Sequence, residues 1–329
     1  MNDNDKRKKI MLALILSAII VLISFIYNNY VAKAKPVAKS DFLFNTIVEI
    51  QLNDSTDESL IDDCFALGDR YEQYFSRTRT DSDIYKINHA GGASVEVHEE
   101  TAALIRTGIE YGAFSEGAFD ITIGALSDLW DIPNNQNTVP SQADIARALA
   151  TVDYKQIDVT GNTVTLKNPD AMLDLGGIAK GYAADQMKAY LNENGVHEGF
   201  INLGGNVLTL GEKKDGPYRI GIQKPFDEGG AVITTVEIDD QSVVTSGRYE
   251  RYFEKDGRIY HHILNPADGY PYESGLNGVT IISDSSMEGD ALSTICFALG
   301  MEKAKALLSN MPDVDAIFID KDNRLFLDD

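Results

Sequence analysis

The sequence predicts an α+β fold: a single mixed domain with largely antiparallel sheets and flanking helices, preceded by an N-terminal transmembrane segment. Three observations lead to this prediction. Helical periodicity dominates the first half of the chain after residue 42, strand patterns dominate from residue 199, and residues 10–26 form an uncharged apolar run. Because no linker or repeat interrupts residues 42–329, we expect them to form one domain.

The apolar run is long enough to cross a bilayer. At 1.5 Å per residue it spans roughly 26 Å, close to the bilayer core of about 30 Å. Residues 6–9 are Lys-Arg-Lys-Lys, which favours a cytoplasmic N-terminus over residues 1–9, an anchor over 10–27, a tether over 28–41 and a body on the extracytoplasmic face of the membrane. The alternative is a signal peptide cleaved after Ala32-Lys33-Ala34, and the length of the run favours the anchor.

The charge is divided between the two parts of the chain. Residues 1–35 hold six Lys or Arg and two Asp, a net charge of +4, so a total of −22 leaves −26 on residues 36–329. Such an acidic body is not expected to bind nucleic acid. An anionic ligand would need a local cation, for which Lys180 and Arg248 are the candidates.

The two cysteines, Cys64 and Cys296, lie in apolar helical patterns and are expected to be buried free thiols rather than a disulfide. The sequence has no Cys and His spacing typical of a zinc site.

The apolar pattern also predicts the elements of the domain in chain order. A strand is expected at 42–51, and helices at 60–75, 99–114 and 141–149. Residues 80–83 predict a helix N-cap or a turn, and residues 157–167 a hairpin around Gly161-Asn162. Later residues predict strands at 200–210, 218–223, 231–238, 258–263 and 278–283, helices at 287–299 and 301–311, and a closing hairpin within 314–327.

Residues 173–185, Leu-Asp-Leu-Gly-Gly-Ile-Ala-Lys-Gly-Tyr-Ala-Ala-Asp, predict a short apolar strand, a two-glycine turn and a helix over 178–194. Unpaired N–H groups at a helix N-terminus suit a phosphate, and glycine allows close backbone approach. Asp174 adds a possible hydroxyl or metal contact. The spacing matches neither the dinucleotide fingerprint nor the P-loop, so this segment alone is equally consistent with a tight turn.

Four further segments concentrate glycine, acidic and hydroxyl residues. In one of them, Asp290 and Thr294 share a helix face, and their oxygens suit Mg²⁺. The alternative is that Asp290 caps the helix and Thr294 bonds to its own helix. His262 could contact a ligand or serve a structural role. The four segments are residues 117–124, 201–206, 244–249 with 261–271, and 287–294.

Together these segments resemble, in order, those of the ApbE family, the FAD:protein FMN transferases. Phe75-Ser76-Arg77 and Leu129-Trp130 add to the resemblance, which covers residues 42–329. It implies an ApbE/T-fold-like domain that uses FAD and Mg²⁺ to move FMN onto a Thr or Ser hydroxyl of a partner protein through a phosphoester bond, releasing AMP. The implied acceptor is a flavoprotein with a motif of the D-[GS]-x-[ST]-[GS]-A-[ST] kind. A Mg²⁺-dependent FAD pyrophosphatase and a non-enzymatic surface flavin-binding protein remain the alternatives.

The resemblance also implies roles for individual residues. The metal would be held by Asp290, Thr294 and the Gly177 carbonyl, with Ser293 as a weaker candidate. The implied catalytic residues are Asp290, Asp174 and His262, the two carboxylates being candidates to accept the proton of the acceptor hydroxyl. Phe44-Asn45-Thr46 stands where the family usually has Met-Gly-Thr. The implied FAD contacts are Phe44, Ala118, Phe119, Asp120, Asp174, Lys180, His262 and Leu264.

Overall fold

The structure, a computed structural model, describes residues 11, 15, 17–23, 35–135, 137–227 and 229–328. The expected cytoplasmic segment, residues 1–9, half of the expected anchor and the start of the tether lie outside these residues. Residues 11, 15 and 17–23 are helical. Within the described part of the chain, no helix has the length and apolar character needed to span a membrane.

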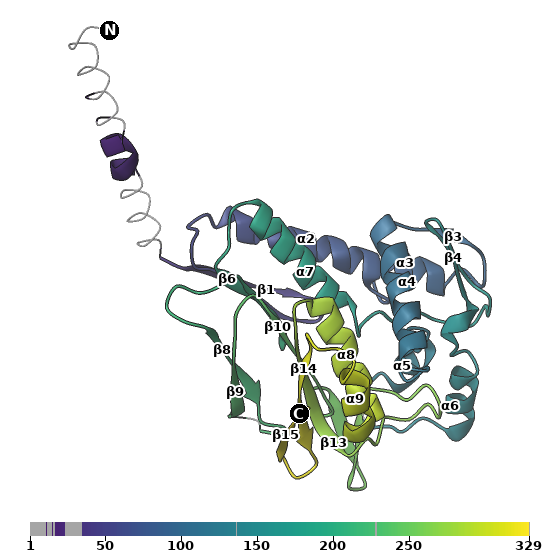
Figure 1. The fold of residues 1–329 in the computed structure, drawn as a ribbon. Helices are drawn as coiled ribbons and strands as arrows, with labels where there is room; N and C mark the ends of the chain where they lie inside the picture. Colours follow the sequence, from purple (N-terminus) through teal and green to yellow (C-terminus); the bar gives the residue numbers. More distant parts are fainter. Residues whose placement is uncertain are drawn as a thin grey trace.

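The centre of the domain is an eight-stranded sheet with the order β1-β2-β6-β7-β10-β13-β14-β15 (Figure 1). Every neighbouring pair is antiparallel. This confirms the predicted mixed α+β domain. The strands are β1 (Val37–Leu43), β2 (Thr46–Leu52), β6 (Gly199–Leu203), β7 (Asn206–Leu210), β10 (Ser242–Gly247), β13 (Leu276–Ser283), β14 (Asp315–Asp320) and β15 (Leu325–Leu327).

Helices and a hairpin cover the two faces of this sheet. Val244 of β10 packs against Gly289 of a helix, whereas its neighbour Val243 packs against Tyr218 of the hairpin, because successive strand residues point to opposite faces. The helical face carries α2 (Ser59–Phe75), α7 (Ala179–Glu193), α8 (Ser286–Leu299) and, against α8, α9 (Met301–Leu308); the other carries β8 (Tyr218–Gln223) and β9 (Val232–Ile238).

A second group of elements lies beside the sheet, toward the right of Figure 1. Ser82 caps α3 by accepting a hydrogen bond from the Tyr85 N–H, which confirms the N-cap predicted for residues 80–83. The group comprises α3 (Asp83–Asn88), α4 (Glu99–Phe114), α5 (Gly124–Trp130), α6 (Gln142–Leu149), the 3₁₀ turn η1 (Tyr154–Gln156) and the small sheet β3 (Val95–Glu96), β5 (Thr163–Leu166) and β4 (Ile157–Thr160).

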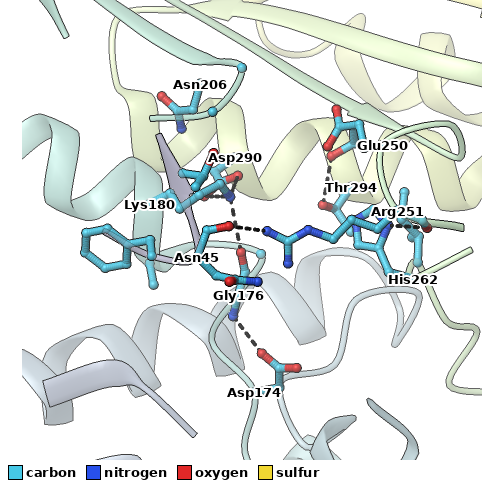
Figure 2. Close-up of a pocket in the computed structure, with 18 of the residues that line it drawn as sticks. Asn45, Asp174, Gly176, Lys180, Asn206, Glu250, Arg251, His262, Asp290 and Thr294 are labelled. Atoms are coloured by element: carbon cyan, nitrogen blue, oxygen red, sulfur yellow. Dashed lines mark hydrogen bonds and ion pairs between the residues drawn. The ribbon is translucent and has the colours of Figure 1, made fainter. Parts of the chain in front are cut away.

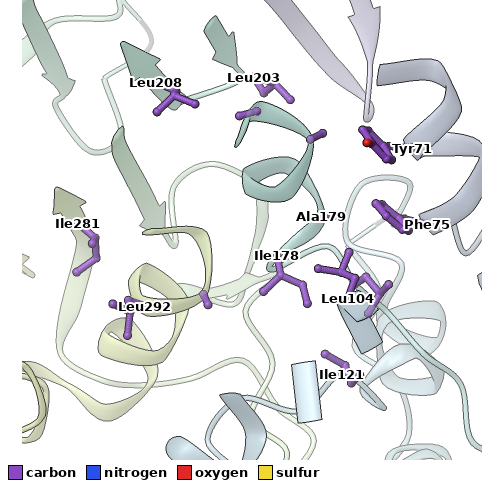
Figure 3. Packing of buried hydrophobic residues seen from close by; sticks show 14 of the residues in the cluster. Tyr71, Phe75, Leu104, Ile121, Ile178, Ala179, Leu203, Leu208, Ile281 and Leu292 are labelled. Atoms are coloured by element: carbon purple, nitrogen blue, oxygen red, sulfur yellow. The ribbon is translucent and has the colours of Figure 1, made fainter. Parts of the chain in front are cut away.

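The main hydrophobic core joins the two groups at the start of α7. Figure 3 shows Ile178 and Ala179 among side chains from α2, α4 and α8, such as Phe75, Leu104 and Leu292. Ile178 is fully buried. The glycine turn that precedes α7 is therefore held in position by the core on both sides of it.

Two local features differ from expectation. Residues 37–41, expected in the tether, belong to β1, which pairs with β2 from Val37↔Leu52 to Leu43↔Thr46. Phe44 and Asn45 form the two-residue turn between β1 and β2, with φ of 52° and 57°. Hairpin turns of this kind usually contain Asn-Gly, which makes them recognisable in a sequence. The single strand expected at residues 42–51 is thus the end of one strand and the whole of the next.

The short strand expected at residues 173–175 is also absent from the structure. Met172 makes an isolated parallel bridge to Ile123, and the Asn88 side chain then takes the place of a strand partner. It donates to the Leu173 carbonyl at 2.9 Å and accepts from the Leu173 N–H at 2.7 Å. These two side-chain hydrogen bonds satisfy the backbone N–H and carbonyl of Leu173 without a neighbouring strand.

Candidate active site

One large pocket of about 1330 Å³ opens between the β1–β2 turn, the glycine turn before α7, the start of α8 and the segment that contains His262 and follows β12 (Arg258–His261). Figure 2 shows its polar side chains. Of the metal, catalytic and FAD-contact residues implied by the resemblance, only the weaker metal candidate Ser293 does not line this pocket, because it is fully buried and hydrogen-bonds to Ser246 at 2.9 Å. The residues that line it are Phe44, Ala118, Phe119, Asp120, Asp174, Gly177, Lys180, His262, Leu264, Asp290 and Thr294.

The first turn of α7 is tied to α8 through one backbone N–H. The Gly181 N–H has no acceptor within the helix, because the first intrahelical hydrogen bond runs from the Tyr182 N–H to the Ile178 carbonyl, and it donates to Asp290 Oδ2 at 3.1 Å. Among the described residues no hydrogen bond to the Gly177 carbonyl is present. The Gly177 oxygen is therefore free to bind a ligand. A side chain at residue 177 would also collide with the ring of Phe119, which a Cβ would approach to 2.8 Å.

Asp290 is an almost fully buried acid inside α8, with 4% of its surface exposed. Lys180 Nζ lies 3.1 Å from its Oδ1. The predicted alternative, that Asp290 caps its helix, is wrong, because Ser285 is the N-cap and accepts from the Glu288 N–H. Thr294, one turn later, hydrogen-bonds to Ser246 of β10 at 3.2 Å rather than only to its own helix.

Asp174 stabilises the glycine turn. Its Oδ1 accepts the Gly176 N–H at 2.9 Å, and its Oδ2 lies 3.3 Å from Arg77 Nε. Arg77 also forms an ion pair with Asp128. Both carboxylate oxygens of Asp174 are thus engaged, and the acid fixes the shape of the turn and the position of a pocket arginine.

The wall formed by residues 118–120 is also strongly braced. The Ala118 carbonyl accepts from the Tyr272 hydroxyl at 2.9 Å, and Phe119 is buried. Asp120 accepts from the Thr122 N–H, the Thr122 hydroxyl and the Tyr154 N–H. Burial raises the pKa of Asp120, while these three hydrogen bonds favour its charged form. Its carboxylate has a structural role in addition to its place in the pocket.

His262 is held as a neutral base. Burial, with Arg251 and His261 nearby, lowers its pKa to about 3. Its Nδ1 lies 3.4 Å from the Arg251 carbonyl, which can only accept a hydrogen bond. This contact assigns the proton to Nδ1 and leaves the lone pair on Nε2. The adjacent His261 is structural: its Nε2 bonds to the Tyr272 carbonyl at 2.9 Å.

The structure adds pocket residues that the sequence did not single out. Arg251 lines the pocket, and its guanidinium donates to the Asn45 carbonyl at 3.4 Å. Glu250 also lines the pocket, where desolvation raises its pKa to about 7 against the opposing effect of Lys180 and Arg251. Both residues directly follow segment 244–249, so their charge beside a motif was the available signal.

Arg248, expected as a cation for the ligand, is not among the residues that line the pocket. Its Nε donates to Asn277 at 2.8 Å, and its guanidinium lies over the Phe226 ring. Arg248 begins the turn that follows β10, whereas Arg251 lies at the end of this turn and lines the pocket. The cations of the pocket are instead Lys180, Arg77 and Arg251.

Within the described part of the chain, no group of three or more His, Cys, Asp and Glu side chains is close enough to hold a metal ion. Both cysteines are buried and free, as predicted. A metal bound by the described residues would therefore take at most two such side chains, together with hydroxyl and carbonyl oxygens.

A sheet covered by helices, with a deep pocket in which cations, a free carbonyl and a neutral histidine converge, is typical of an α+β enzyme that acts on a small anionic ligand. The comparisons with known proteins define the family. The model of the ApbE family matches residues 44–318, so the chain belongs to this family.

Relatives of known type cover most of the chain. An FAD:protein FMN transferase of Klebsiella pneumoniae is 43% identical over 276 residues, which cover 83% of this chain and 86% of the relative. An FAD:protein FMN transferase of Treponema pallidum is 33% identical, and the matched residues cover 89% of this chain and 87% of the relative. The crystal structure of the ApbE protein of Thermotoga maritima has a TM-score of 0.82 at 33% identity and covers 89% of this chain and 97% of that one.

Proposed function

We propose that this protein transfers FMN from FAD to a Thr or Ser hydroxyl of an acceptor protein, forming a phosphoester and releasing AMP. Family membership and the names of its relatives support flavin transfer. One observation carries the assignment to this pocket: the Gly177 carbonyl, which has no hydrogen-bond partner among the described residues, lines the pocket together with a buried acid, Asp290, and the Lys180 ammonium paired with it.

The residues present fit a magnesium ion. Mg²⁺ prefers oxygen ligands and retains waters and substrate phosphates. The carboxylate of Asp290, the hydroxyl of Thr294 and the free carbonyl of Gly177 are all such ligands, and we assign the ion to them. When bound, Mg²⁺ supplies positive charge to the pyrophosphate oxygens.

The chain's own residues orient the substrate. Lys180 and Arg251 place positive charge in the pocket, which suits a diphosphate. Phe44, Phe119 and Leu264 offer apolar surface for the ring system of a flavin. These contacts are the ones that phosphoryl transfer needs, since it depends mainly on positioning and charge neutralisation.

The proton of the acceptor hydroxyl passes to His262. The hydroxyl oxygen bonds to the FMN phosphorus, the bond from that phosphorus to the bridging oxygen breaks, and AMP leaves with that oxygen. Asp174 and Asp290 are weaker candidates for the base because both are engaged, Asp174 with Arg77 and Asp290 with Lys180. His262 Nε2 has a free lone pair and a neutral ring.

The expected acceptor is a flavoprotein with a D-[GS]-x-[ST]-[GS]-A-[ST] motif. Residues 10–27 would anchor the enzyme, so that the domain meets its acceptor at the extracytoplasmic face of the membrane. Fractionation of cells that produce the full chain tests this location: recovery in the soluble fraction would contradict it.

Incubation of the full chain with FAD, Mg²⁺ and a motif-bearing peptide tests the transfer itself. The expected product is a peptide that carries one FMN on its Thr or Ser, with AMP in equal amount. Rapid formation of AMP and free FMN without the peptide would instead identify a pyrophosphatase, and tight FAD binding without any AMP would identify a flavin-binding protein.

A further inference from the structure

Asn206 is the first residue of β7 and follows the Gly204-Gly205 turn. Its side chain lines the pocket but is only 1% exposed. Backbone pairing fixes it from both sides, with Leu203 of β6 and Val244 of β10 as its partners. Asn206 is therefore a rigidly placed amide in a wall of the pocket.

Half of this amide is left without a hydrogen-bond partner. Its Oδ1 accepts from the Ser286 hydroxyl at 2.5 Å, whereas Nδ2 has no partner among the described residues. A buried donor without a partner costs about 1–3 kcal/mol, and native proteins retain few of them. Such a donor in a pocket wall indicates that a ligand completes its hydrogen bonding.

The neighbours of Asn206 indicate which group of the ligand would accept its hydrogen bond. Ser286 begins α8, one turn before Asp290 and on the same helix face. Figure 2 shows the amide nitrogen of Asn206 directed toward Lys180 and Asp290. The group expected beside a buried ammonium and the proposed metal ligands is the diphosphate of the dinucleotide.

We propose that the Asn206 carboxamide donates a hydrogen bond through Nδ2 to a phosphate oxygen of the bound dinucleotide. This inference rests on the proposed placement of FAD in this pocket. It makes Asn206 a substrate-binding residue that selects for a diphosphate, in addition to the residues implied by the resemblance. A fixed neutral donor beside Lys180 also orients the phosphate, which a flexible ammonium alone does less well.

Two variants test the proposal through dissociation constants, measured by flavin fluorescence for FAD and by calorimetry for ADP and adenosine, at fixed Mg²⁺. Asn206→Leu removes the donor at similar volume and adds no charge, and Asn206→Asp replaces the donor with a carboxylate. Both variants should bind FAD and ADP roughly 10- to 100-fold more weakly, which is the loss expected for a hydrogen bond to a charged group. Adenosine, which lacks phosphate, should bind the variants and the wild type alike.

Ser286→Ala is the matched control, because it removes the partner of Oδ1 and keeps the Nδ2 donor. It should retain FAD affinity, and thermal unfolding of all three variants shows whether each is folded. Should Asn206→Leu not fold, Asn206→Asp carries the test.

Three results would overturn the inference: unchanged FAD affinity in both Asn206 variants, an equal loss for adenosine, or an equal loss in Ser286→Ala. A wild-type protein that fails to bind FAD would instead contradict the proposed function.

Discussion

Lys180 and Asp290 join helices α7 and α8 through a largely buried ion pair, in which Nζ lies 3.1 Å from Oδ1. The backbone of the residue after the lysine reinforces the pair, since the Gly181 N–H donates to the other carboxylate oxygen at 3.1 Å. In consequence the glycine turn, the acid and the cation are fixed with respect to one another before any ligand binds. This relationship gives the pocket its proposed metal ligand and its proposed phosphate contact at one point.

Replacing Asp290 by Asn should lower FMN transfer by about 10²- to 10³-fold, the loss typical of one electrostatic contact to a transition state. Mg²⁺ affinity, measured by calorimetry, should fall as well. Asp185→Asn is the control, because Asp185 also links α7 to α8, through the N–H groups of Ser286 and Met287, but does not line the pocket. The control should lose about 1 kcal/mol of stability as a weakened helix cap and keep its activity. Equal activity in Asp290→Asn and wild type would remove Asp290 from the metal site.

Replacing Lys180 by Met should destabilise the metal-free protein, because Asp290 is left as a buried charge with only the Gly181 N–H as partner. The expected loss is about 3 kcal/mol. Mg²⁺ binding should then raise the Tm of the variant more than that of the wild type, since the ion replaces the missing positive charge. Scanning calorimetry with and without Mg²⁺ measures both effects. An equal rise in Tm would show that the ion does not bind Asp290.

Replacing His262 by Ala should slow transfer by about 10²- to 10⁴-fold while FAD affinity changes little, because general base catalysis contributes to the chemical step. The matched control is His261→Gln, which keeps a donor for the Tyr272 carbonyl. Steady-state kinetics with fluorescence titration of FAD separates the two effects. A loss of FAD affinity with unchanged turnover would make His262 a binding residue only.

His261, which is buried, and His262, which is partly exposed in the pocket, should make stability depend on pH. Burial lowers the pKa of His261 to about 4 and that of His262 to about 3, from an ordinary value of 6.5. The unfolded chain therefore binds more protons below pH 6.5, so stability falls as pH falls, by about 1.4 kcal/mol per pH unit for each histidine. Urea unfolding between about pH 7 and pH 5 should show a shallower slope for His261→Gln. An unchanged slope would mean that His261 becomes protonated in the folded protein.

The two thiols should be inert in the folded protein. Cys64 and Cys296 are fully buried, and burial raises the pKa of each to about 12. Because only the thiolate reacts readily, a thiol reagent at neutral pH should modify both residues in denaturant and neither in buffer. Modification of the native protein at a rate independent of its unfolding would contradict this.

Local chemistry explains which parts of the fold the sequence could predict. Amphipathic helices such as α4, expected and found at residues 99–114, have a period that shows in the sequence. Strand β10 was not predicted, because a strand buried on both faces has no alternation. Most of strand β1 was assigned to the tether, because the turn that follows it is Phe-Asn and contains no glycine that would indicate a hairpin.

For the site as well, features set by local sequence could be predicted, and features set by tertiary contacts could not. Residues within sequence motifs, such as Asp174 and Asp290, were recognised and lie in one pocket. Arg251 and Glu250 lie outside these motifs, and Asn206 lies at the end of segment 201–206 without an assigned role. Whether such side chains enter the pocket depends on how a strand or turn directs them, and that direction is decided by tertiary pairing. The same reason accounts for Arg248, which was expected in the pocket and instead packs on Phe226. The bond from Gly181 to Asp290 joins residues far apart in the chain and could not be predicted from either motif.

Covalent flavinylation of a motif-bearing acceptor, followed by mass spectrometry of the acceptor and quantification of AMP, tests the account most directly. The full chain with FAD and Mg²⁺ is predicted to add one FMN to a Thr or Ser of the acceptor, to release one AMP for each FMN added, and to stop when the metal is chelated. An acceptor that stays unmodified while FAD is split to FMN and AMP at the same rate with and without it would contradict the account.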